Sequence, residues 1–128
     1  MARLMVVDDS QVMRRIIANM IHQHTGHIVV AEAENGQDAV EKYREFLPDL
    51  VTMDMTMPVM DGCEAVKQII GEFPAAKIVM VSSVNERSKV IAAIQCGAVS
   101  FLLKPVGGFK LRELADRILA DSASTCPR

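Results

Sequence analysis

Residues 4–10 of the chain read LMVVDDS, a short apolar run that ends in two consecutive carboxylates and a hydroxyl. Four apolar residues followed at once by Asp8, Asp9 and Ser10 are typical of a buried strand whose carboxyl end opens into a polar turn. The run shows no alternation of apolar and polar residues, which favours a strand that is covered on both faces. This stretch therefore predicts a parallel sheet with helices on both sides and with polar chemistry at one edge of the sheet.

Four further apolar runs of strand length follow along the chain, at 27–31, 50–53, 78–81 and 100–103. Between these runs, apolar residues recur with the spacing of helices. The helical stripes are Val12, Met13, Ile16, Ile17, Met20 and Ile21; Ala39, Val40, Tyr43 and Phe46; Ala65, Val66, Ile69 and Ile70; Val90, Ile91 and Ile94; and Leu111, Leu114, Ala115, Ile118 and Leu119. Because strands that alternate with helices are joined by right-handed crossovers, we expect a doubly wound α/β domain with five parallel strands and five helices.

Polar residues at the expected helix starts agree with this interpretation. Asn35 precedes the second stripe, Asp61 is followed by Glu64, and Ser83 is followed by Glu86. Side chains of this kind accept hydrogen bonds from the free N–H groups of a first helical turn.

Composition and charge exclude several classes of protein. With 128 residues, of which 50% are hydrophobic and 23% are charged, the chain has room for one folded domain. The net charge of -2 argues against a dedicated nucleic-acid-binding protein, and no apolar run approaches the roughly 20 residues of a membrane span. We expect no signal peptide, because the first apolar run is short and ends at Asp8.

The cysteines and the end of the chain complete this outline. Three widely spaced cysteines fit reduced thiols, so we expect a cytoplasmic protein. Residues 122–128 are small and mostly polar, and we expect a domain at 1–121 followed by a disordered tail at 122–128.

The residues that follow the expected strands carry the candidate chemistry. In open parallel sheets the working surface lies at the carboxyl ends of the strands. Asp8 and Asp9 follow the first run, Asp54 the third, Ser82 the fourth and Lys104 the fifth. Carboxylates that lie close together repel one another unless a cation is bound, and Mg²⁺ is the first candidate because it prefers oxygen ligands. Together with a hydroxyl and an ammonium group, these carboxylates predict a site for phosphoryl transfer in which one Asp is the acceptor.

Each of these residues alone has an ordinary structural explanation. An Asp after a strand is more often a helix cap or a turn residue than part of a site, and either Asp9 or Ser10 would suit the cap of the first helix. Lys104 followed by Pro105 is by itself a common turn. The combination of polar residues at the ends of different strands is what favours a functional site.

Three histidines, His22, His24 and His27, form a string that resembles a set of metal ligands. Residues two positions apart do not share one face of a helix, however, and Gly26 is expected to end the helix before His27. We therefore interpret the three imidazoles as separate structural residues rather than as a metal site.

Several motifs together resemble those of the receiver domains of two-component response regulators. The motifs are LMVVDDS at 4–10, Asp54 with MPVMDG at 57–62, Ser82 with Ser83, and FLLKP at 101–105. The resemblance extends from Leu4 to about Leu119 and is greatest to single-domain chemotaxis regulators of the CheY kind. It implies a flavodoxin-like sheet with the strand order 2-1-3-4-5.

The resemblance also implies a role for each residue of the candidate site. Asp54 would accept a phosphoryl group from the phosphohistidine of a histidine kinase. Asp9, Asp54 and the backbone carbonyl of Thr56 would ligate Mg²⁺, and Asp8 would support the ion largely through water. Lys104 would bind the phosphoryl group. The protein would thus assist its own phosphorylation and dephosphorylation rather than act as an enzyme on another substrate.

The resemblance also implies that phosphorylation changes the surface to which a partner protein binds. The hydroxyl of Ser82 would move towards the phosphoryl group, and the ring of Phe101 would turn inward. The face formed by the fourth helix, the fifth strand and the fifth helix would then bind a partner such as a flagellar motor switch component, with no direct contact to nucleic acid or membrane. That face carries a basic rim made of Arg87, Lys89, Lys110 and Arg112.

Two alternatives remain open from the sequence. The chain would also suit a receiver domain taken from a longer regulator that has a DNA-binding or methylesterase output domain. A more remote alternative is a Mg²⁺-dependent phosphatase of the haloacid dehalogenase type, which also uses an Asp at a strand end, a hydroxyl and a Lys. The run Asp54-Met55-Thr56 argues against this phosphatase, because it lacks a second Asp two residues on that would serve as a general acid.

Overall fold

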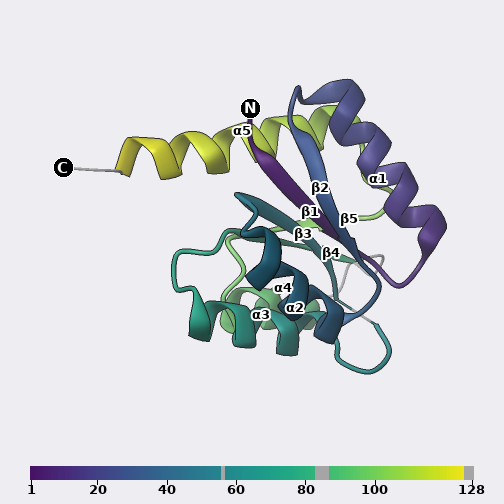
Figure 1. Cartoon of the computed structure of the whole chain (residues 1–128), viewed down its shortest axis with the longest axis vertical. Helices are drawn as coiled ribbons and strands as arrows, with labels where there is room; N and C mark the ends of the chain where they lie inside the picture. The colour runs from purple at the N-terminus through teal and green to yellow at the C-terminus, as the bar shows by residue number, and fades with distance from the viewer. Residues whose placement is uncertain (56, 83–86, 126–128) are drawn as a thin grey trace.

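The computed structural model describes residues 1–55, 57–82 and 87–125, with side chains throughout these ranges except at 87–90 and 121–125. Strands and helices alternate along the chain (Figure 1). The elements are β1 (Arg3–Val7), α1 (Gln11–His24), β2 (Ile28–Ala33), α2 (Gly36–Phe46), β3 (Leu50–Asp54), α3 (Gly62–Glu72), β4 (Ile78–Ser82), α4 (Arg87–Cys96), β5 (Ser100–Leu103) and α5 (Gly108–Thr125). The predicted α/β class is confirmed.

The sheet is parallel throughout and has the order β2-β1-β3-β4-β5, as predicted. Val7 pairs with Met53, and Asp54 pairs with Val81, so β1, β3 and β4 end at nearly the same level. The order of the strands reverses between β1 and β3. Connections leave these two strands in opposite directions, which opens a crevice at their carboxyl ends.

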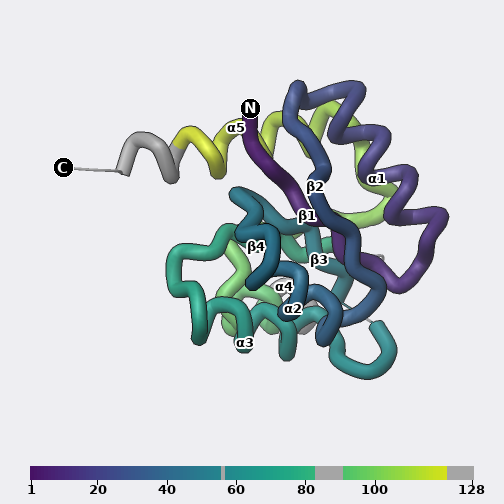
Figure 2. Tube along the Cα trace, in the orientation of Figure 1, coloured from purple at the N-terminus to yellow at the C-terminus, as the bar shows by residue number. Residues whose placement is uncertain are grey.

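Two apolar layers hold the helices against the sheet. Helices α2, α3 and α4 cover one face, and α1 and α5 cover the other (Figures 1 and 2). Val66 and Met80 belong to the first layer, whereas Ile21, Val79 and Leu111 belong to the second. Neighbouring residues of β4 thus point into opposite layers, which explains why this strand is a continuous apolar run.

The predicted helix caps form where their residues are described. Ser10, Asn35 and Asp61 each accept a hydrogen bond from the backbone N–H three residues on. Of the two candidates for the first cap, Ser10 is the cap and Asp9 is not. The predicted cap at 83–86 lies outside the described residues.

Strand β2 differs from its prediction in position and in burial. It runs from Ile28 to Ala33 rather than over 27–31, and it lies at the edge of the sheet. Its final residues alternate, because Ala31 and Ala33 are buried while Glu32 is exposed. An edge strand has one flank open to water, so a polar residue interrupts its apolar pattern.

The end of the chain is helical further than expected. Helix α5 extends to Thr125, so the expected boundary at 121 falls inside this helix. The division into a domain at 1–121 and a tail at 122–128 stays a prediction. Within the described residues, no helix combines the length and the apolar character needed to cross a membrane.

Candidate metal centre

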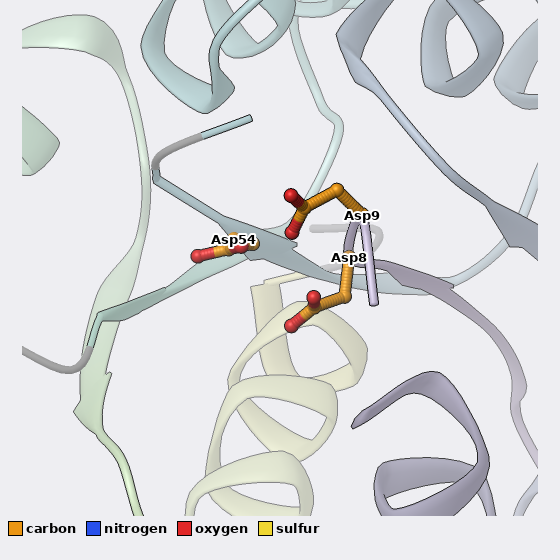
Figure 3. Close-up of side chains that lie close together, drawn as sticks. All are labelled: Asp8, Asp9 and Asp54. Carbon is orange, nitrogen blue, oxygen red and sulfur yellow. The ribbon is translucent and has the colours of Figure 1, made fainter. Parts of the chain in front are cut away.

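Three carboxylates from two neighbouring strands meet at the carboxyl edge of the sheet. Asp8 and Asp9 directly follow β1, and Asp54 is the last residue of β3. One carboxylate oxygen from each residue lies within 4.8 Å of the other two. Figure 3 shows that the side chains of Asp8 and Asp9 extend towards Asp54. Asp8 and Asp54 are 1% and 7% exposed, respectively, whereas Asp9 is open to solvent.

The spacing of these oxygens suits a hard divalent cation. Mg²⁺ binds oxygen at about 2.0–2.1 Å, so two of its ligand oxygens lie at most about 4.2 Å apart. Oxygens that lie within 4.8 Å of one another need only a small movement to share one such ion. The exposure of Asp9 leaves room for the waters that Mg²⁺ tends to retain. The carbonyl of Thr56, expected as a further ligand, lies outside the described residues.

Asp8 is held at all four of its polar atoms. Its backbone N–H donates to the Ala33 carbonyl at 3.1 Å, and its own carbonyl accepts from Nη1 of Arg14 at 2.7 Å. Its carboxylate accepts from the backbone N–H of Ser10 at 2.9 Å and from Nζ of Lys104 at 3.0 Å. Such complete hydrogen bonding is what a buried carboxylate requires, and it fixes one side of the centre.

Lys104 contributes a positive charge at the centre of the site. Its Nζ lies 3.0 Å from Oδ2 of Asp8 and 3.6 Å from Oδ1 of Asp54. Burial alone would lower the pKa of Lys104, but the hydrogen bond that it donates to Asp8 and the charge of Asp54 outweigh burial and raise the pKa above its usual value. The side chain is therefore an ammonium ion at neutral pH. Its backbone N–H donates to the Ser82 carbonyl at 2.7 Å, which joins the ends of β4 and β5.

Ser82 and Phe101 lie on the same face of the sheet. Ser82 ends β4, is 5% exposed and stands two residues after Met80. Met80 pairs with Phe101 of β5, and the half-buried ring of Phe101 packs against the layer that contains Met80. Because side chains alternate along a strand, Ser82 and Phe101 both face the side of the sheet that α4 covers.

The basic rim expected near Phe101 is described only in part. Lys110 and Arg112 are exposed on α5, and Nε of Arg112 lies 3.7 Å from a carboxylate oxygen of Asp116 on the same helix. The side chains of Arg87 and Lys89 lie outside the described residues.

The three histidines make separate contacts. Nε2 of His22 accepts from a backbone N–H of β2 at 3.2 Å, and Nδ1 of His27 accepts from the Ala2 N–H at 3.1 Å. His24 lies against Gly108, where an added Cβ would stand 2.4 Å from the imidazole ring. Within the described part of the chain, Asp8, Asp9 and Asp54 form the one group of three or more His, Cys, Asp or Glu side chains whose ligand atoms lie close enough together to hold a metal ion.

Sequence reasoning missed three residues that support the site. Arg14 contacts the Asp8 carbonyl, and nothing in the helical stripes indicates that contact. Gly62 lets α3 begin directly against β3, because an added Cβ would lie 2.2 Å from the Asp54 carbonyl oxygen. At Gly36 an added Cβ would lie 2.5 Å from the Met60 carbonyl oxygen. The sequence signal for the two glycines was their place beside the caps Asn35 and Asp61.

Comparison with known proteins agrees with this geometry. The family model of the response regulator receiver domain matches residues 4–118, and the chain belongs to this family. Within the family it is similar to the chemotaxis protein CheY of Bacillus subtilis, with 47% identity over 91% of this chain and 97% of the relative. The chemotaxis protein CheY of Listeria monocytogenes is 44% identical over 91% of this chain and 98% of the relative.

A solved structure gives the same result for the fold. A chain of the CheX–CheY–BeF₃–Mg²⁺ complex from Borrelia burgdorferi superposes with a TM-score of 0.85 at 27% identity, covering 91% of this chain and 87% of that chain. Receiver domains of this kind are signalling phosphoacceptors rather than classical enzymes, and they bind Mg²⁺ at an acidic pocket. They take phosphate from kinases and bind output partners. These comparisons support the chemotaxis regulator. They do not favour either alternative, a receiver domain taken from a longer regulator or a phosphatase of the haloacid dehalogenase type.

Proposed function

We propose that this protein is a phosphoacceptor of a two-component system and that Asp54 receives a phosphoryl group from the phosphohistidine of a histidine kinase. One observation carries the proposal. The carboxylate oxygens of Asp8, Asp9 and Asp54 lie within 4.8 Å of one another, and the Lys104 ammonium lies 3.6 Å from Asp54. This cluster combines a carboxylate nucleophile with charges of both signs, which is the arrangement that phosphoryl transfer needs.

Asp54 suits the role of acceptor because it ends β3 as a largely buried carboxylate beside the Lys104 ammonium, at 3.6 Å. Asp9 is exposed, so water would surround its charge and weaken it as a nucleophile. In the proposed transfer, an oxygen of Asp54 forms a bond to phosphorus while the bond from phosphorus to the histidine nitrogen breaks. The electron pair of the broken bond stays on the imidazole.

The remaining groups of the site balance the charge of the transferred phosphoryl group. Asp9, Asp54 and the backbone carbonyl of Thr56 would hold Mg²⁺, with Asp8 supporting it largely through water. When bound, the ion would neutralise phosphoryl oxygens and so lower the barrier to transfer. Lys104 keeps its proton at neutral pH because its pKa is raised, and it would bind a further phosphoryl oxygen. The site would thereby assist its own phosphorylation and its own dephosphorylation.

We propose that phosphorylation is transmitted from Ser82 to Phe101 and then to the α4-β5-α5 face. Apolar side chains exposed on these three elements support this output surface. They are Ile91 and Ile94 of α4, Leu103 of β5 and Phe109 of α5, which are 46%, 63%, 40% and 76% exposed. Exposed apolar side chains on the same elements as the exposed Lys110 and Arg112 suit a protein partner.

The similarity to CheY proteins supports a role in chemotaxis, with a flagellar motor switch component as the output partner. We propose a cytoplasmic protein for the same reason, with no direct partner among nucleic acids or membranes.

Labelling with a small phosphodonor tests the proposal. Wild-type protein incubated with Mg²⁺ and acetyl phosphate should take up one acid-stable, base-labile phosphoryl group. The Asp54→Asn variant should take up none, because an amide cannot form an acyl phosphate. Asp116→Asn, which changes an exposed carboxylate on α5, should be labelled like the wild type. Equal labelling of Asp54→Asn and the wild type, or labelling that needs no divalent ion, would refute the assignment.

A further inference from the structure

We propose that Arg14 is a positioning residue of the metal centre, an inference that rests on the proposed function. Arg14 lies in the first turns of α1 and its side chain is only 15% exposed. Its Nη1 donates to the backbone carbonyl of Asp8 at 2.7 Å, and its Nε lies 3.3 Å from Oε1 of Glu32 on β2. The guanidinium group thus joins the end of β1 to the edge strand through the backbone of Asp8 rather than through its carboxylate.

The carbonyl that Arg14 binds belongs to the peptide unit that joins Asp8 to Asp9. A peptide unit is planar, so a carbonyl held in one direction also sets the direction of the Asp9 N–H. The Asp8 carboxylate is already held by Ser10 and Lys104. Arg14 therefore acts on Asp9 rather than on the Asp8 carboxylate. It sets the direction in which the chain leaves Asp8, and this direction determines where the exposed Asp9 carboxylate lies.

The shape of the side chain suits this task. A guanidinium group is planar and rigid, so its contact with Glu32 fixes the direction in which Nη1 points at the Asp8 carbonyl. Glu32 pairs with Val6 in the sheet register and is thereby held close to the end of β1. A lysine at position 14 could donate to the carbonyl but lacks the fork that joins both groups.

The sign of the effect on cation binding separates positioning from simple electrostatics. A positive charge near an acidic site repels a cation, so removal of Arg14 should strengthen Mg²⁺ binding if charge alone matters. If Arg14 positions the ligands, its removal should weaken binding instead. Loss of an outer group that orients a metal ligand typically costs about tenfold or more in metal affinity.

The experiment titrates the purified full chain with Mg²⁺ alone, in the absence of any phosphodonor, and measures the dissociation constant by calorimetry. Arg14→Met keeps the apolar stem and removes the guanidinium group. We expect it to raise the dissociation constant about tenfold. Arg15→Met removes the same charge from the adjacent, exposed position on α1 and should leave Mg²⁺ binding equal or slightly tighter. Arg14→Lys, which retains the charge and one donor, should recover part of the lost affinity.

A third control separates positioning from general loosening of the fold. Ile69→Val shortens a buried side chain on α3. It should lower the unfolding temperature measured in the presence of a metal chelator, without changing the Mg²⁺ dissociation constant. The inference is overturned if Arg14→Met binds Mg²⁺ as tightly as Arg15→Met, or if Ile69→Val weakens binding as much as Arg14→Met does. Wild-type protein that binds no Mg²⁺ would overturn the metal centre of the proposed function and this inference with it, so the two failures are distinguishable.

Discussion

Lys104 is the residue at which the charges of the site are balanced. Its ammonium group touches Asp8 more closely than Asp54, at 3.0 Å against 3.6 Å. The two carboxylates are almost completely buried, so without this cation they would face each other's charge in a medium of low polarity. Lys104 therefore serves the stability of the fold as well as the proposed chemistry.

The raised pKa of Lys104 predicts a particular loss of stability at alkaline pH. A base whose pKa is raised by folding stabilises the folded state while it is protonated in both states. That contribution is complete below the unfolded value of 10.5 and disappears as the pH rises through the folded value. We therefore expect the free energy of unfolding of the wild type to fall more steeply above pH 10.5 than that of Lys104→Gln.

Urea unfolding at neutral pH and above pH 10.5 measures this difference. Lys110→Gln removes an exposed lysine of α5 and should follow the wild type at both pH values. Parallel losses of stability in the wild type and Lys104→Gln would contradict this account of Lys104.

At the scale of elements, the start of α3 packs closely against the site, at the end of β3. Asp61 caps the helix, and the Gly62 N–H donates to the Met55 carbonyl at 3.0 Å, so the helix begins in direct contact with the end of β3. The cap could be predicted from Asp61 and Glu64, because capping chemistry is local. The close approach of Gly62 to Asp54 could not, because it depends on where α3 packs against the sheet.

Two glycines of α3 form a matched pair for testing this contact. A Cβ added at Gly62 would lie 2.2 Å from the Asp54 carbonyl oxygen, whereas a Cβ at Gly71 meets nothing within 4 Å. Gly62→Ala should lower the free energy of unfolding by about 2 kcal/mol, because backbone must shift to admit the methyl group. Gly71→Ala should be neutral or raise it by up to about 1 kcal/mol, because alanine favours the helix.

Chemical unfolding of the two variants measures these values, and acetyl phosphate labelling reports on the site. Gly62→Ala should also slow labelling, since the shift involves the backbone of the acceptor residue. A Gly62→Ala protein as stable as Gly71→Ala would show that the close approach has no energetic importance.

At the scale of the whole molecule, the site and the proposed output face share β5. Lys104 directly follows this strand, and Phe101 lies within it beside α4. A change at the carboxyl edge of the sheet thus has a short path to the surface.

The alternation of strands and helices, and hence the fold class, could be predicted because buried strands and amphipathic helices have distinct periods. The strand order came from the resemblance. The contact of Arg14 with Asp8 could not be predicted. The sequence assigns Asp8 to the carboxyl edge of the sheet, but which helix side chain reaches its carbonyl depends on how α1 packs against the sheet.

The most direct test of the central claim is to identify the residue that carries the phosphoryl group. After incubation with acetyl phosphate and Mg²⁺, reduction with borohydride converts an aspartyl phosphate into homoserine, and peptide sequencing by mass spectrometry locates the change. The account predicts homoserine at position 54 and aspartate at positions 8 and 9. Homoserine at position 8 or 9 with an unchanged Asp54, or no homoserine in labelled protein, would contradict it.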